Sequence, residues 1–179
     1  MRLLLHACCA PCSTWSIETL RKEYELTCFF HNPNIQPREE YEARLSDTKR
    51  YCSAVGITLV EGEYEIEKWN LETRGHEDDP EGGERCGICY RIRLEGTGAR
   101  AAEGGFDAFS TTLTTSPHKD AGVINRIGEE IGGKVGVPFL SLNLKKQDGF
   151  KKSVEMSRQH NLYRQEYCGC VYSQRKSTV

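Results

Sequence analysis

Seven of the nine cysteines in this chain fall into three close-set groups, and these groups are the residues most able to do chemistry. They are Cys8, Cys9 and Cys12; Cys86 and Cys89; and Cys168 and Cys170. Thiolates bind soft and borderline metals, and neighbouring thiols also exchange electrons through disulfides. A single C-x-x-C pair is a weak signal, but three groups in one chain predict a metal or redox centre.

Three kinds of centre fit these residues. A structural zinc site needs four ligands in a closed tetrahedron, which Cys86, Cys89 and two other cysteines would supply. A thiol–disulfide oxidoreductase needs only two thiols, such as Cys9 and Cys12 in the C-A-P-C motif. A [4Fe–4S] cluster takes four thiolates from scattered loops. Zinc does not account for seven cysteines or for the adjacent pair Cys8 and Cys9, whose side chains we expect to diverge toward two atoms of a larger cluster.

Buried strands alternate with amphipathic helices along the chain. Apolar runs predict strands at 3–5, 26–30, 57–60, 106–113 and 137–142. Helical spacing of apolar residues predicts the intervening helices, and a last, basic helix is expected at 149–160. This alternation predicts an α/β fold with a parallel sheet covered on both faces. Cys28 and Cys52 lie in such apolar patterns, so we expect both in the core.

The loops that carry chemical groups each follow a predicted strand. These loops contain residues 8–12, Asn32 and residues 111–119. Ligands of open α/β sheets bind beyond the carboxyl ends of the strands, so we expect the metal site at this edge. A helix that starts at Ser13 or Thr14 would also lower the pKa of nearby thiols.

Composition and charge point to a cytoplasmic protein. The chain has no apolar run long enough for a membrane span and no secretory pattern at its start, so no membrane partner is expected. Clustered cysteines in such a protein are more typical of metal or redox sites than of disulfides. The net charge is only −2, but bases gather near the end of the chain and could bind phosphates. These bases are Lys145, Lys146, Lys151, Lys152, Arg158 and Arg164.

Five stretches, taken together, are specific enough to suggest a family. They are HACCAPC at 6–12, FHNPNIQPREEYEAR at 30–44, RCGICYRIRL at 85–94, FSTTLTTSPHK at 109–119 and YRQEYCGCVYS at 163–173. In this order they resemble the cobalamin-independent epoxyqueuosine reductases called QueH. The resemblance implies a Rossmann-like three-layer fold in one domain spanning 1–179. It also implies an oxidoreductase that reduces epoxyqueuosine to queuosine in tRNA, the last step of queuosine biosynthesis, with electrons from an unidentified donor.

The resemblance further implies the cofactors and their ligands. A [4Fe–4S] cluster with an adjacent mononuclear iron is expected, and the cluster ligands would be Cys8, Cys9, Cys86 and Cys89. Cys12, Cys168 and Cys170 would hold the second iron, or the last two would form a redox-active pair. Family members can have Asp at the position of Cys12, and a thiolate there would change the metal preference and potential of the site.

Several polar residues near these motifs are candidates for contact with the substrate. His118 is expected as a proton donor. The substrate-binding candidates are Asn32, Asn34, Thr111, Thr112, Ser116 and Lys119. Each also has a purely structural explanation, such as capping by Ser116 or turn formation by the two asparagines. Two other functions stay open from the sequence: a zinc-stapled RNA-binding module and a thiol–disulfide oxidoreductase.

Overall fold

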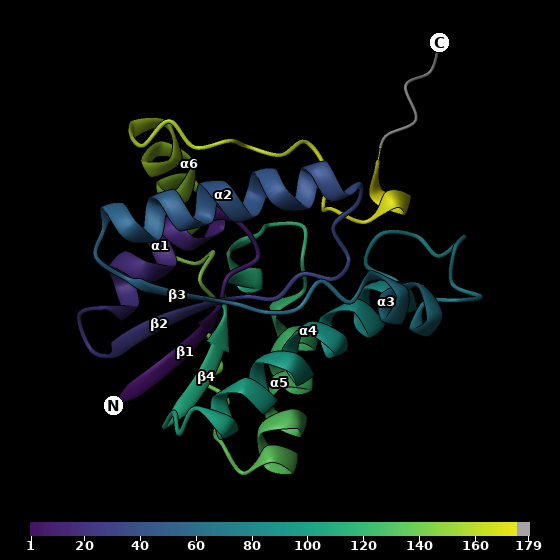
Figure 1. The fold of residues 1–179 in the computed structure, drawn as a ribbon, viewed down its shortest axis with the longest axis horizontal. Helices are drawn as coiled ribbons and strands as arrows, with labels where there is room; N and C mark the ends of the chain where they lie inside the picture. Colours follow the sequence, from purple (N-terminus) through teal and green to yellow (C-terminus); the bar gives the residue numbers. More distant parts are fainter. Residues whose placement is uncertain (175–179) are drawn as a thin grey trace.

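A parallel four-stranded sheet forms the centre of the protein (Figure 1). The computed structural model describes residues 1–174. The strands are β1 (Arg2–His6), β2 (Glu25–Phe30), β3 (Thr58–Glu61) and β4 (Ala108–Thr111), and their order across the sheet is β3-β2-β1-β4. Leu4 in β1 lies opposite Thr27 on one side and Phe109 on the other. The predicted α/β fold with a parallel sheet is therefore confirmed.

Helices cover both faces of this sheet (Figure 1). One face carries α1 (Ala10–Leu20), α2 (Arg38–Ala54) and α6 (Gly149–Gln159), and the other carries α4 (Glu84–Glu103) and α5 (Ala121–Val135). The short α3 (Ile66–Glu72) packs beside α4, and two 3-10 turns, η1 (Thr112–Thr115) and η2 (Val171–Ser173), complete the elements. Across residues 1–174, no helix combines the length and apolar character needed to cross a bilayer.

The core is split into two halves by the sheet. Successive side chains of a strand point to opposite faces, so Leu3 and Leu5 pack against α1 and α2 while Leu4 packs against α4 and α5. Because both faces are buried, β1 is a continuous apolar run rather than an alternating pattern. Cys28 and Cys52 lie in the half under α1 and α2, as predicted, and are 0% and 1% exposed.

The predicted fifth strand at 137–142 is wrong. This segment makes only an isolated bridge between Phe139 and Phe109. The amide of Phe109 donates to the carbonyl oxygen of Pro138 (3.0 Å), and the amide of Leu140 donates to Phe109 (2.8 Å). Pro138 has no amide hydrogen, so the pairing cannot extend toward Val137, and on the other side the Ser110 hydroxyl bonds the Leu140 carbonyl oxygen (2.8 Å) that a ladder would use. The predicted strand at 106–113 is also shorter than expected, because the Thr111 side chain accepts from the amide of Leu113 and turns the chain into η1.

The strand order creates a switch point between β1 and β4. From β1 the chain proceeds to β2 and β3 on one side of the sheet, and it returns to place β4 on the other side. Connections therefore leave β1 and β4 toward opposite faces, and open α/β folds bind ligands in the gap at such a point. The 8–12 loop follows β1 here, and η1 follows β4.

Candidate metal centre

The first cysteine group forms a tight cluster of thiols at the switch point. The Sγ atoms of Cys8, Cys9 and Cys12 all lie within 4.8 Å of one another, and those of Cys8 and Cys9 are 3.8 Å apart. The expectation that the Cys8 and Cys9 side chains diverge is wrong. The chain bends at Cys8 and enters α1 at Ala10, so the alternation of an extended strand is broken and the thiols converge.

Hydroxyl groups of η1 hold this loop in place. The Cys8 amide donates to Thr112 Oγ1 (3.0 Å). The Thr112 hydroxyl in turn donates to Cys8 Sγ (3.3 Å). Thr115 Oγ1 donates to the carbonyl oxygen of Cys12 (3.4 Å), and Thr111 Oγ1 lies 2.8 Å from Nδ1 of the buried His6. The hydroxyls of Thr111 and Thr112 are thus buried and bonded within the protein, and their roles toward a substrate stay predictions.

The three thiols of the loop do not ionise independently. Hydrogen bonds from Cys12 and Cys9 hold the pKa of Cys8 well below its usual range. The hydrogen bonds of Cys12 to Cys8 and Cys9, together with burial, raise the pKa of Cys12. In the metal-free protein Cys8 is therefore the first thiolate, and a metal that binds all three must displace the remaining protons.

The second cysteine group occupies the first two turns of α4. Cys86 and Cys89 are three residues apart and so face the same side of the helix. Cys86 Sγ accepts from the amide of Gly82 (3.3 Å). Cys89 is buried against Trp69 and Cys170, and burial raises its pKa to about 11. An unpaired thiol here is neutral, so its use as a ligand needs a metal or a positive charge nearby.

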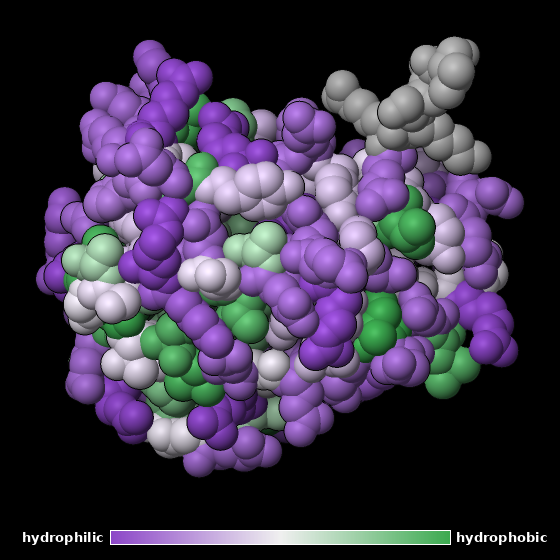
Figure 2. Space-filling model, turned by 45° about the horizontal axis from the view of Figure 1, so that its top comes forward, coloured by the Kyte–Doolittle hydropathy of each residue, from purple (hydrophilic) through white to green (hydrophobic). Residues whose placement is uncertain are grey.

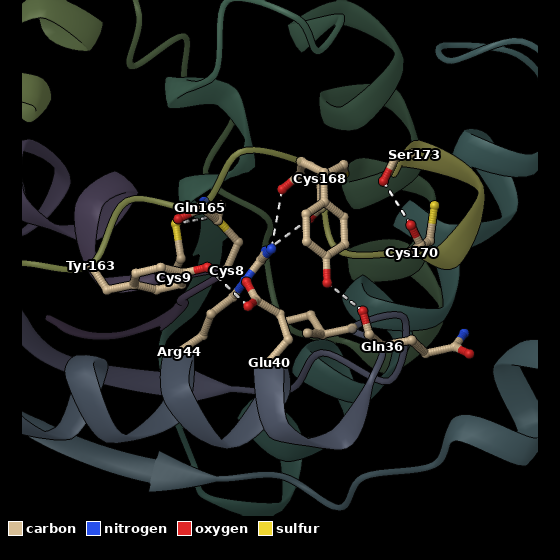
Figure 3. A network of polar contacts seen from close by, with 12 residues as sticks. Cys8, Cys9, Gln36, Glu40, Arg44, Tyr163, Gln165, Cys168, Cys170 and Ser173 are labelled. Atoms are coloured by element: carbon tan, nitrogen blue, oxygen red, sulfur yellow. Dashed lines mark hydrogen bonds and ion pairs between the residues drawn. The ribbon is translucent and has the colours of Figure 1, made fainter. Parts of the chain in front are cut away.

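The third group lies on a C-terminal segment that we call the strap, residues 160–174. Arg44 of α2 holds the strap by its backbone, donating to the carbonyl oxygens of Cys168 (3.0 Å) and Tyr167 (3.1 Å) (Figure 3). Its Nε also pairs with Glu40 (2.7 Å). Gly169 has a φ of +128°, which residues with a side chain rarely adopt, and its Cβ would meet Arg44. This glycine lets the strap turn between its two cysteines.

The strap contacts both other cysteine groups. Gln165 Nε2 donates to Cys9 Sγ (3.1 Å), and Cys170 packs in the same buried cluster as Cys89 (Figure 3). The structure therefore brings all three groups to the edge where β1 and β4 end. The sequence could not indicate Gln165, because a lone polar residue in an irregular segment carries no pattern.

Two basic side chains lie among these thiols. Arg93 is 2% exposed and donates to Asn32 Oδ1 (2.6 Å). Lys119 is half-buried; burial opposes its charge, but the thiols of Cys168 and Cys8 outweigh that effect and raise its pKa. The sequence did not indicate Arg93 as a site residue, because an arginine within an amphipathic helix normally faces solvent.

The remaining substrate candidates lie in different environments. Asn32 is fully buried, and both ends of its amide are bonded to protein atoms. Asn34 is 1% exposed, and neither end of its amide has a protein partner. Ser116 is half-buried and accepts from the amide of His118, whose side chain is exposed. The roles of Asn34, Ser116, His118 and Lys119 toward a substrate stay predictions.

Comparison with known proteins gives a consistent result. A family model described as "Epoxyqueuosine reductase QueH" matches residues 3–176. The protein named epoxyqueuosine reductase QueH from Streptococcus pyogenes serotype M1 is 39% identical over 177 residues, covering 96% of this chain and 69% of the relative. The protein of the same name from Thermotoga maritima is 38% identical over 174 residues, covering 96% of this chain and 89% of the relative.

A solved structure shares the fold. It is the U34-tRNA thiolase NcsA from Methanococcus maripaludis with its [4Fe-4S] cluster, at a TM-score of 0.58 and 15% identity. The match covers 97% of this chain but only 61% of that chain, so the thiolase is considerably longer. This likeness supports the α/β architecture alone. The family model and the sequence relatives carry the assignment: the chain belongs to the epoxyqueuosine reductase QueH family.

Proposed function

We propose that this chain reduces epoxyqueuosine to queuosine in tRNA at an iron–sulfur centre held by its cysteines. The observation that carries the proposal is the convergence of the Cys8, Cys9 and Cys12 thiols within 4.8 Å at the switch point of a QueH-family chain. The whole chain, residues 1–179, would act as one QueH-like domain. Its free, clustered thiols fit a reducing compartment, so we assign it to the cytoplasm.

The donor set fits a [4Fe–4S] cluster. In this proposal Cys8, Cys9, Cys86 and Cys89 hold the cluster, because sulfur ligands from separate loops are the usual cluster ligands. Cys12, Cys168 and Cys170 then remain for the additional iron, or the last two form a redox-active pair. A buried arginine without a carboxylate partner lies beside these thiols, which supports an anionic metal–thiolate group at this position. When bound, such a cluster supplies electrons one at a time.

The side chains around the thiols would position the substrate and protonate it. Loss of the epoxide oxygen as water requires two electrons and two protons, and both carbon–oxygen bonds break. His118 and Lys119 follow η1 and would donate protons or hydrogen bonds to the leaving oxygen. Ser116 and the unpartnered amide of Asn34 would bind polar groups of the modified base. The strap, which contacts two cysteine groups, would limit access of water to the reacting atoms.

The metal content of anaerobically purified protein tests the proposal directly. We expect about four or more irons per chain, acid-labile sulfide and a brown colour that dithionite bleaches. Cys86→Ser and Cys89→Ser should each abolish the colour. Cys52→Ala is the matched control, because Cys52 is buried in the core away from the three groups and its loss should leave the iron content unchanged. A colourless protein with one zinc, or activity without any metal, would overturn the iron–sulfur proposal.

An epoxyqueuosine reductase acts on tRNA, and we propose that α6 and the preceding turn bind its phosphates. The segment lies beside the metal centre, since Phe150 and Arg164 line a small pocket together with Cys12. Lys152 lies over the Trp15 ring (4.2 Å from the centroid), and Lys151 is exposed. Hydrophilic side chains dominate the upper left of Figure 2, where Figure 1 has α6.

Charge reversal tests this tRNA surface. Lys151→Glu and Lys152→Glu together should weaken tRNA binding at low salt and reduce the salt slope by about 1 for each lost phosphate contact. Lys134→Glu is the control, because Lys134 is exposed near the end of α5, at the opposite edge of the parallel sheet. Equal binding by the double variant and the wild type would remove α6 from the interface.

A further inference from the structure

A buried positive charge lies between the cysteine groups without a carboxylate partner. Arg93 of α4 is 2% exposed. Among residues 1–174, no carboxylate oxygen lies within 4.0 Å of its guanidinium, whereas the equally buried Arg44 pairs with Glu40 at 2.7 Å. A buried ion without a counter-ion is strongly destabilising, so the surroundings of Arg93 favour an anion beside its guanidinium.

Arg93 is connected to two of the cysteine groups, one through its own helix and one through Asn32. It follows Cys89 by four residues, so the two share one face of α4. Its Nη2 donates to Asn32 Oδ1 (2.6 Å), and Asn32 Nδ2 in turn donates to the carbonyl oxygen of Ala7 (3.0 Å), immediately before Cys8. The Arg93 Nε has no protein partner. Asn32 therefore holds the guanidinium near the start of the 8–12 loop, on the face of α4 that carries Cys89.

The ionisable groups that act most strongly on Arg93 are the thiols of Cys89, Cys8 and Cys168, whose negative charge, once they are ionised, offsets the cost of burying the guanidinium. These three residues represent all three cysteine groups.

We propose that Arg93 is the permanent counter-charge of the metal centre, a positioning residue that stabilises its thiolates and raises the reduction potential of the cluster. The inference rests on the proposed function for the identity of the cluster. A cluster with four thiolate ligands is anionic and gains one more negative charge on reduction. A fixed cation beside it therefore favours the reduced form, and removing that cation should make reduction harder.

The midpoint potential of the cluster, measured by anaerobic redox titration, tests this inference. Arg93→Met should make one-electron reduction about tenfold less favourable, which corresponds to a potential about 59 mV lower. Arg93→Lys keeps the charge and should restore most of the wild-type value. Arg91→Met is the control on the same helix: Arg91 is half-buried with 37% of its side chain exposed and pairs with Glu130 (2.7 Å), so solvent screens its charge and the potential should not change.

A second variant separates the charge from the packing of the arginine. Asn32→Asp keeps the shape of the side chain and places a carboxylate where Arg93 now bonds an amide oxygen. If Arg93 acts through its charge, Asn32→Asp neutralises it and should lower the potential as Arg93→Met does. An unchanged potential would mean that charge at this position does not act on the cluster. That result in a variant with normal iron content would overturn the inference.

Cobalt binding to metal-free protein keeps the inference testable if the cluster proposal fails. Thiolate ligands give Co²⁺ intense charge-transfer absorption, which reports binding without any catalytic assay. We expect Arg93→Met and Asn32→Asp each to weaken Co²⁺ binding about tenfold, and Arg91→Met to leave it unchanged. A wild-type protein without iron or sulfide that shows this pattern would refute the proposed function alone. Unchanged Co²⁺ binding together with an unchanged potential would refute the role of Arg93 alone.

Discussion

The 8–12 loop and the strap bring cysteines to the same place, but the protein holds them by different means. The loop continues directly from β1 into α1, and buried hydroxyls of η1 bond its backbone. The strap has no regular secondary structure before η2, and side chains of α2 hold its backbone. One segment is thus fixed by the sheet and the other by a row of side chains.

This difference predicts where the site is vulnerable. Parallel pairing in β1 fixes the loop through backbone hydrogen bonds that no single side chain controls. The strap depends on a few α2 residues, and Arg44 alone bonds two of its carbonyl groups. Segments with few regular hydrogen bonds open more easily than strands. We therefore expect the strap to detach as a unit while the loop stays in place.

Arg44→Met should produce the largest effect. The substitution leaves Glu40, whose side chain is 13% exposed, without its cation, and breaking such a pair costs on the order of 3–5 kcal/mol. If this free energy is lost from the attachment of the strap, the strap should open more often and expose Cys168 and Cys170. Each 1.4 kcal/mol is a tenfold change, so iodoacetamide should alkylate both thiols of the metal-free protein about a hundredfold faster or more. Mass spectrometry of the labelled protein measures the rate at each cysteine.

The control for this experiment lies further along α2. Arg50 also bonds strap carbonyls, those of His160 and Asn161, but its side chain is 52% exposed. Arg50→Met should therefore cost less than about 1 kcal/mol and change the labelling of Cys168 far less. Equal acceleration at Cys8 and Cys168 in Arg44→Met would contradict the comparison, because it would mean that the loop and the strap open together.

Acid should lower the free energy of unfolding by a smaller amount, because the buried His31 is uncharged in the folded protein and gains a proton on unfolding. This side chain is 3% exposed at the end of β2, and burial lowers its pKa from 6.5 to about 4. Between these values the unfolded chain binds the proton and the folded chain does not, so stability is lost as pH falls from 6.5 toward 4, by about 3 kcal/mol. His31→Asn should flatten this part of the pH profile in urea unfolding experiments. An unchanged profile would show that His31 is already protonated in the folded protein.

Thr112→Val should have the smallest effect. It removes the hydroxyl that accepts from the Cys8 amide, and an unsatisfied buried amide costs about 1–2 kcal/mol. Because β1 and α1 still hold the loop, we expect iron content to remain near the wild-type value. Thr19→Val removes a hydroxyl of α1 that bonds only Trp15 and should cost less. Complete loss of iron in Thr112→Val would mean that the loop depends on side chains as much as the strap does.

Much of the fold could be predicted from the sequence, and so could the shared sheet edge of the 8–12 loop, Asn32 and the segment after β4. The apolar run at 3–5 is buried on both faces, as a parallel strand requires, and loops that follow parallel strands must share an edge. The strand at 137–142 could not be excluded in this way. Its apolar pattern is suitable, and it fails because Pro138 lacks an amide hydrogen and because the Leu140 carbonyl oxygen bonds the Ser110 side chain rather than a strand amide.

Other parts of the site depend on contacts that leave no local pattern. Cys8 and Cys9 converge because the chain bends between a strand and a helix, and residue spacing does not report a bend. Arg93 is buried because Asn32 and three thiols surround it, and those partners are distant in sequence. The strap has neither a helical nor a strand period, so only the folded structure indicates where Cys168 and Cys170 lie.

The hydrogen bond between the Cys8 amide and Thr112 spans 104 residues of sequence. This separation determines the stage of folding at which the metal site can form. An unfolded chain brings such distant segments together only at a large cost in entropy, so no preformed binding site is present before β4 has joined β1. Metal uptake would then follow chain closure and stabilise the closed state through mass action. Iron release during denaturation would consequently report the loss of β1–β4 pairing, which makes the centre a natural probe of global unfolding.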